Sequence, residues 1–179
     1  MLPDPLHPAI VHFPVVLAVL LPIFAAGSLW AIRRGTTPRR AWAVPVALSV
    51  ALALSAWVAV QTGQAQDERV ERVVAEQPLE THEEAAELFL LLSAGMALLA
   101  GAGLARGRIG QAARGLATVG AAVLVGVVVQ VGHSGGQLVY RYGAASAYTG
   151  ARRQGPSPAA TSAGEHRVPA VAARRKGDD

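Results

Sequence analysis

Four long apolar runs constrain the fold of this sequence more than any other feature. The runs cover about residues 9–32, 41–61, 82–105 and 115–140, and their middles contain no Lys, Arg, Asp or Glu. Each run is long enough to cross the hydrocarbon core of a bilayer, which takes about 20 residues of helix. In lipid the backbone must satisfy its own hydrogen bonds, so each run folds as a helix. The sequence therefore predicts an all-α, four-helix transmembrane bundle.

The composition supports the same fold class and excludes several functions. Hydrophobic residues make up 52% of the chain and charged residues only 16%, which is too apolar for an ordinary soluble domain. The absence of cysteine excludes disulfides, iron–sulfur clusters and covalently attached haem. Aromatic residues are only 5%, so stacking on nucleic-acid bases has little support. The composition predicts the lipid bilayer as the partner, and no nucleic acid.

The charges between the apolar runs predict the orientation of the bundle. The first and third links carry arginines: Arg33, Arg34, Arg39 and Arg40, then Arg106, Arg108 and Arg114. The second link, residues 62–81, is mainly acidic. Because cytoplasmic loops of membrane proteins are rich in Lys and Arg, we expect the arginine links in the cytoplasm. This gives an N-out/C-out, multi-pass protein of the bacterial inner membrane.

The last thirty residues differ from the rest. Residues 150–179 are rich in Pro, Ala, Ser, Gly and Arg, and contain almost no bulky apolar side chain. Such a segment lacks the apolar surface needed to offset the entropy of ordering, so we expect it to be disordered. The chain is thus divided into a transmembrane domain, 1–149, and a basic tail, 150–179. His166 lies in the tail and is expected to be solvated.

Four histidines lie near the ends of the apolar runs and are predicted to meet at the outer membrane face. They are His7, His12, His82 and His133. A helix rises about 1.5 Å per residue, which puts His133 just inside the outer boundary of the hydrocarbon core, with His12 at a similar depth. His82 and His7 come nearer the surface. Ionisable residues inside a membrane are functional candidates, so depth ranks His12 and His133 first, His82 next and His7 last.

Imidazole nitrogen binds haem iron, copper, iron and zinc, so the four histidines are predicted as a haem b site. If the cofactor is a divalent metal ion instead, the predicted ligands are His12, His133 and His82. Other residues near the histidines are expected to support the site: Thr62, Gly63, Glu83, Ser134, Gly135, Gly136 and Tyr140.

The supporting residues are expected to contribute to the site in different ways. Thr62 and Gly63 are expected as a helix C-cap whose hydroxyl lines the site. Thr81 to Glu84 matches a capping box, which would put His82 in the first helical turn. Glu83 is a candidate partner that orients a histidine. Glycines next to a ligand allow a flat macrocycle or another helix to come close. The plainer alternative is a glycine-rich helix end with Tyr140 at the membrane interface.

The motifs at the two ends of the chain resemble one bacterial family. HPAIVHFPVVL, Thr62-Gly63, His82 and HSGGQLVYRYGA together are similar to the membrane family catalogued as domain of unknown function 2231, over about residues 5–145. The resemblance implies a four-helix membrane fold in which the motif histidines are His7, His12, His82 and His133. The association of that family with respiratory and haem-containing proteins implies a redox membrane partner. Tyr142 stands where many relatives have a further histidine.

The leading interpretation is a histidine-based haem b or metal site at the outer face, with a role in electron transfer. The alternative is a non-redox interaction or assembly protein, in which the histidines form structural hydrogen bonds between helices. A transporter is less favoured, because no charge lies in the middle of the membrane. No nucleophile motif is present, so the sequence favours a role without catalysis of its own. The oligomeric state is not indicated.

Overall fold

The structure, a computed structural model, describes residues 6–149, and this part of the chain is helical with no strand. Its helices are α1 His7–Ile10, α2 His12–Arg33, α3 Pro38–Gln64, α4 Asp67–Val70, α5 Glu76–Ala102, α6 Gly107–Tyr140 and α7 Ser146–Thr149. Within residues 6–149, four helical segments are long and apolar enough to cross a membrane, and α1 and α2 together make the first. The prediction of an all-α bundle with four spans is confirmed. The predicted tail, with His166, lies outside the described residues.

Two of the long helices begin earlier than the sequence predicted. Helix α5 begins at Glu76 rather than near residue 82, and α6 begins at Gly107 rather than near 115. Hydropathy detects the apolar part of a helix and misses polar turns beyond it. The predicted capping box is wrong for the same reason, because Thr81 lies inside α5 and its hydroxyl donates to the Gln77 carbonyl over 2.9 Å. Pro78 instead lies in the first turn, where its missing N–H is not needed.

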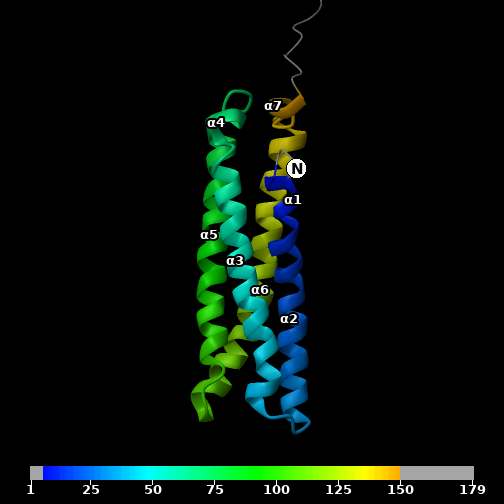
Figure 1. The fold of residues 1–179 in the computed structure, drawn as a ribbon, viewed down its shortest axis with the longest axis vertical. Helices are drawn as coiled ribbons and strands as arrows, with labels where there is room; N and C mark the ends of the chain where they lie inside the picture. Colours follow the sequence, from blue (N-terminus) through cyan, green and yellow to red (C-terminus); the bar gives the residue numbers. More distant parts are fainter. Residues whose placement is uncertain (1–5, 150–179) are drawn as a thin grey trace, which may run out of the picture.

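The four long helices pack side by side along one axis (Figure 1). Helix α3 packs between α2 and α5, and α6 closes the bundle by packing against both α5 and α2. Helices α2 and α5 are therefore diagonal, as are α3 and α6. Helix α1 extends α2 at one end of the bundle and packs against α3. A histidine on α1 and one on α5 can thus face each other across the interior.

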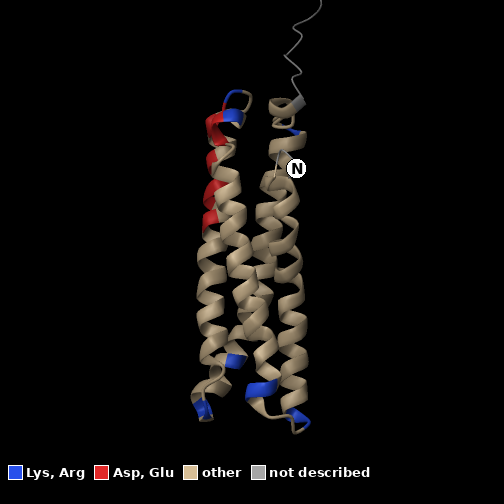
Figure 2. Cartoon of the chain, viewed as in Figure 1, with Lys and Arg blue, Asp and Glu red and all other residues tan. Residues whose placement is uncertain are grey.

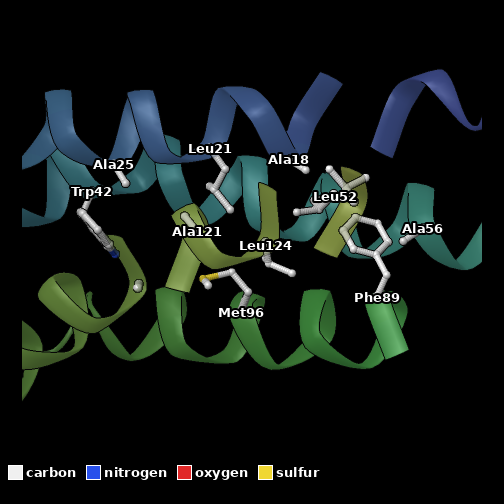
Figure 3. Close-up of a cluster of buried hydrophobic side chains, with 12 residues drawn as sticks. Ala18, Leu21, Ala25, Trp42, Leu52, Ala56, Phe89, Met96, Ala121 and Leu124 are labelled. Carbon is white, nitrogen blue, oxygen red and sulfur yellow. The ribbon is translucent and has the colours of Figure 1, made fainter. Parts of the chain in front are cut away.

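The core repeats along each helix at alternating spacings of three and four residues. This is the repeat of helices that pack with a slight left-handed twist. The buried positions that follow this repeat through the middle of the bundle are Pro14, Ala18, Leu21, Ala25 and Ser28 on α2; Trp42, Pro45, Ser49, Leu52, Ala56 and Ala59 on α3; Phe89, Ser93, Met96 and Ala100 on α5; and Ala117, Ala121, Leu124 and Val128 on α6. Many are small, which allows close approach in lipid. Figure 3 shows the larger side chains filling the space between the helices.

The two ends of the bundle differ in charge (Figure 2). Every Asp and Glu of residues 6–149 lies between Asp67 and Glu87, and we call this end, with α4 and the adjoining ends of α3, α5 and α6, the acidic end. A small apolar cluster of Val74, Leu79, Leu138 and Ala144 packs there. We call the opposite end, with links 34–37 and 103–106, the basic end. The arginine links and the acidic link thus lie at opposite ends.

Candidate functional site

His7 at the acidic end has a defined tautomer. Its Nδ1 lies 2.9 Å from the carbonyl oxygen of Ala59 and 3.3 Å from Oγ1 of Thr62. A carbonyl oxygen only accepts hydrogen bonds, so Nδ1 carries the proton and donates. The Thr62 hydroxyl uses its one hydrogen on the carbonyls of Val58 and Ala59, each 3.0 Å away, and so it also accepts from His7. In the neutral ring, Nε2 therefore has the lone pair.

His82 on α5 is held in the same way. Its Nδ1 lies 2.9 Å from Oγ of Ser134 on α6. The Ser134 hydroxyl donates its one hydrogen to the Val131 carbonyl over 2.9 Å, so its oxygen accepts the hydrogen bond from His82. The Nδ1 atom of His82 is again the protonated nitrogen, and Nε2 again has the lone pair. Two histidines from different helices thus share one tautomer.

His7 and His82 lie on different helices at the same end of the bundle. His7 extends the α2 side of the bundle and His82 belongs to the diagonal helix α5, and both side chains are half-buried. The two histidines are close enough to influence each other electrostatically. Because each ring is oriented through Nδ1, both keep Nε2, the nitrogen that commonly ligates metals when Nδ1 donates to a neighbouring group. We call this arrangement the histidine pair.

A glycine packs against each ring of the histidine pair. A Cβ atom added at Gly63 would lie 3.3 Å from Cε1 of His7, and one added at Gly135 would lie 3.0 Å from Cε1 of His82. These glycines therefore allow a helix backbone to approach an imidazole. By contrast, a Cβ at Gly136 would meet nothing within 4 Å. Of the predicted glycines, Gly63 and Gly135 lie at the histidine pair and Gly136 does not contact it.

His12 and His133, which depth ranked first, are exposed on the outside of the bundle. The side-chain amide of Gln137 donates to Nε2 of His133 over 2.8 Å, so that ring uses its lone pair on its own helix. Depth describes position along a helix axis and ignores position around it. His12 is five residues after His7, which turns it about 140° away. Tyr140 is 92% exposed, as expected for an interfacial side chain.

Thr62 and Gly63 lie inside α3, which ends at Gln64 with Ala65 as the C-cap residue, so the predicted C-cap is wrong. Helix α3 continues beyond its apolar run, as α5 and α6 do. The Thr62 hydroxyl contacts His7. Ala59 and Val131 contribute through their carbonyls, and no side-chain pattern reveals such backbone partners.

The acidic side chains near the histidine pair are arranged differently from the prediction. Asp67 of α4 interacts electrostatically with His7, and sequence reasoning did not single it out. Burial, and secondly the charge of Glu71, raise the pKa of the Asp67 carboxyl above its usual value, while His7 acts in the opposite direction. Glu83, predicted to orient a histidine, interacts with Asp67 and other carboxylates. Asp67 is thus the acidic group that acts on His7.

The core repeat is the sequence signal that identifies the interior histidines. His7 lies seven residues before buried Pro14, and His82 lies seven residues before buried Phe89. The two contacting glycines follow the same rule, with Gly63 seven residues after Ala56 and Gly135 seven after Val128. His12 and His133 fall outside the repeat. Extending each buried stripe by one heptad therefore separates the two pairs of histidines.

The histidine pair offers two nitrogen ligands. Within residues 6–149, no group of three or more His, Cys, Asp or Glu side chains could hold a metal ion. Protein metal sites for zinc usually need three or four such ligands, whereas haem iron needs only one or two. The donor set therefore fits haem better than a bare divalent ion.

Comparison with known proteins identifies a family over most of the chain. The family model described as "Predicted membrane protein (DUF2231)" matches residues 3–147. This range includes all four spans and both residues of the histidine pair. No curated protein and no solved structure matches the chain.

Proposed function

The chain belongs to the DUF2231 family of predicted membrane proteins, and we propose that it binds haem b through His7 and His82. In this proposal it is a multi-pass protein of the bacterial inner membrane that transfers electrons. The observation that carries the proposal is the shared tautomer of the pair. Both Nδ1 atoms donate to fixed oxygens, so both Nε2 lone pairs are available for iron.

The chemistry of the donor set favours haem over a metal ion. Haem supplies four nitrogen ligands itself and adds a reversible one-electron couple, so two protein imidazoles complete its coordination. The chain has no cysteine, and Met1 and Met96 are its only methionines, so soft copper(I) has little support. Ala59 and Ser134 accept hydrogen bonds from the two Nδ1 atoms, so in this proposal Nε2 of each ring is the nitrogen that would bind iron.

The position of the histidine pair suggests how electrons would be exchanged. The pair lies where spanning segments meet the acidic end, close to the surface that a membrane partner would approach. A respiratory or other redox protein of the same membrane is the partner that this proposal implies. The prediction that the acidic end faces outward would make the exchange periplasmic.

Visible spectroscopy of the purified chain tests the proposal. Expressed with a haem precursor, the wild type should show a Soret band and sharp bands on reduction. His7→Ala and His82→Ala should each lose most of the bound haem. His12→Ala and His133→Ala are matched controls at the same end, and they should keep wild-type content because both side chains are exposed. A colourless wild type, or equal haem content in all four variants, would refute the assignment.

A second candidate function is a non-redox interaction or assembly protein. Two observations favour it: no larger ligand group occurs in residues 6–149, and the Nδ1 hydrogen bonds already join α1 to α3 and α5 to α6. In this case the purified protein binds no cofactor, and His7→Ala lowers its thermal stability by the loss of an interhelical hydrogen bond, about 0.5–1.5 kcal/mol. Cofactor content and stability therefore separate the two candidates.

A further inference from the structure

A pocket of about 250 Å³ lies at the basic end, between the start of α3 and the link that joins α5 to α6. Its wall includes Thr37 and Arg39 from the α3 side and Arg106 and Arg114 from the α6 side. Helix α3 begins at Pro38 and helix α6 begins at Gly107, and both of these residues also line the pocket. The pocket therefore combines three guanidinium groups with the N-termini of two long helices.

Arg114 is the least expected of the three arginines that line the pocket. Its side chain is only 7% exposed, although a buried guanidinium is costly unless a counter-charge is near. Its Nη1 donates to the Gly103 carbonyl over 2.6 Å, which occupies part of its hydrogen-bonding capacity. Every carboxylate of residues 6–149 lies at the acidic end, and within that part of the chain Arg114 forms no ion pair. Its charge has no anionic partner there.

The remaining groups reinforce the positive potential. Arg39 donates through Nε to the Leu104 carbonyl over 3.2 Å, which leaves its two terminal nitrogens for another acceptor. Neither Thr37 nor Arg106, the N-cap residues of α3 and α6, uses its side chain to cap its own helix. Free backbone N–H groups and the helix dipole make such N-termini favourable places for an anion.

We propose that this arginine pocket binds the phosphate group of an anionic phospholipid. A phosphate matches the planar fork of arginine and accepts several hydrogen bonds at once. The pocket lies where three spanning helices begin or end, which is the level of lipid phosphates in a bilayer. Basic pockets between membrane helices bind lipid headgroups in this way. The proposal is independent of the histidine pair.

The test compares two double variants of the full chain in detergent. Arg39→Gln with Arg106→Gln removes two charges from the pocket, and Arg40→Gln with Arg108→Gln removes two charges from neighbouring positions that do not line it. Arg114 is left unchanged because it braces Gly103. Native mass spectrometry measures retained phosphatidylglycerol against zwitterionic phosphatidylcholine. Thermal unfolding measures the response to inorganic phosphate at constant ionic strength.

The wild type should retain phosphatidylglycerol in preference to phosphatidylcholine. The pocket variant should bind it at least about tenfold more weakly, because a single lost hydrogen bond to a charged group is already worth about that factor. The outside variant should stay within about twofold, as expected for screened surface charge. Equal loss in both variants, or no preference in the wild type, overturns the proposal.

Two further results are also decisive. If inorganic phosphate alone stabilises the wild type and not the pocket variant, while lipid shows no preference, the site takes phosphate from solution and the lipid assignment falls. If the pocket variant fails to fold, Arg106→Gln is compared with Arg108→Gln, since both side chains are exposed and make no hydrogen bond to the backbone of the links. The same difference in lipid retention is then expected between these single variants.

Discussion

The two ends of the bundle use polar side chains in opposite ways. At the basic end, side-chain donors bond carbonyls at the end of α5: Trp42 Nε1 donates to Ala100, in the last turn of α5, over 2.9 Å, and Arg114 donates to Gly103, the C-cap residue, over 2.6 Å. These two bonds join α3 and α6 to the end of α5. At the acidic end, His7 and His82 donate with one nitrogen and keep a lone pair on the other. The side-chain donors of the basic end therefore fix helix ends in place. At the acidic end, each histidine keeps the lone pair of Nε2 as an acceptor.

The largest expected effect concerns which side of the membrane each end faces. Because the chain has no cysteine, a single cysteine at exposed Thr36 or exposed Gln77 can be labelled without background. In intact cells an impermeant thiol reagent should label the Gln77 position and leave the Thr36 position unlabelled, as the positive-inside rule requires. Permeabilised cells, in which both should react, are the control. The reverse pattern would move the histidine pair to the cytoplasmic side.

The next largest effect tests how tightly the basic end is packed. A Cβ at Gly110 would collide with the backbone carbonyl of Ala105, whereas one at Gly115 on the same helix would meet nothing within 4 Å. Overpacking against backbone typically costs about 1–3 kcal/mol, so Gly110→Ala should lower the free energy of unfolding by about that amount. Gly115→Ala should be neutral or slightly stabilising, since alanine favours helix. Equal unfolding curves for Gly110→Ala and Gly115→Ala in detergent would show that the link containing Ala105 can move away from the added Cβ atom.

A smaller effect at the acidic end distinguishes two neighbouring glycines. In Gly135→Ala the new methyl would lie 3.0 Å from Cε1 of His82, so the ring must move by a few tenths of an ångström and lengthen its bond to Ser134. We expect Gly135→Ala to be about 0.5–1.5 kcal/mol less stable than Gly136→Ala, the value of one hydrogen bond. If haem is bound, Gly135→Ala should also shift its visible bands. Indistinguishable variants would mean that the ring is not confined.

The fold follows from the sequence because lipid leaves few alternatives for a long apolar run. The four spans and the arginine links were predictable in this way, and the helix ends were not. Glu76 and Gly107 begin helices whose first turns are polar, and nothing in hydropathy marks them. Such turns lie beyond the apolar run, where water satisfies the backbone and polarity gives no evidence against helix.

The candidate site was predictable only in part, because a site depends on position around a helix as well as along it. The four histidines were found by type and by their nearness to helix ends. The core repeat then separates His7 and His82 from His12 and His133, and it is present in the sequence. The partners Ala59 and Val131 were not predictable, since they act through carbonyls that every residue has.

The smallest expected effect concerns Asp67, the carboxylate that acts on His7 from outside the spans. Burial and Glu71 raise its pKa in the folded protein, so folding favours its protonated form. Its contribution to stability is therefore lost as the pH rises through the folded pKa, and it is lowest at neutral pH. Asp67→Asn mimics the protonated form, so its melting temperature should exceed that of the wild type by a degree or so at neutral pH.

The direction of this change is the informative part. Near about pH 3 the Asp67 carboxyl is protonated and uncharged, like the amide of the Asp67→Asn variant. The difference in melting temperature between the two proteins should therefore vanish. The exposed Glu68, next to Asp67 on α4, provides the matched control, and Glu68→Gln should leave the melting temperature unchanged at either pH. If Asp67→Asn instead lowers the melting temperature at neutral pH, attraction between Asp67 and His7 outweighs burial. The acidic end would then be stabilised by attraction between charges, unlike the basic end, where the arginines donate to backbone carbonyls.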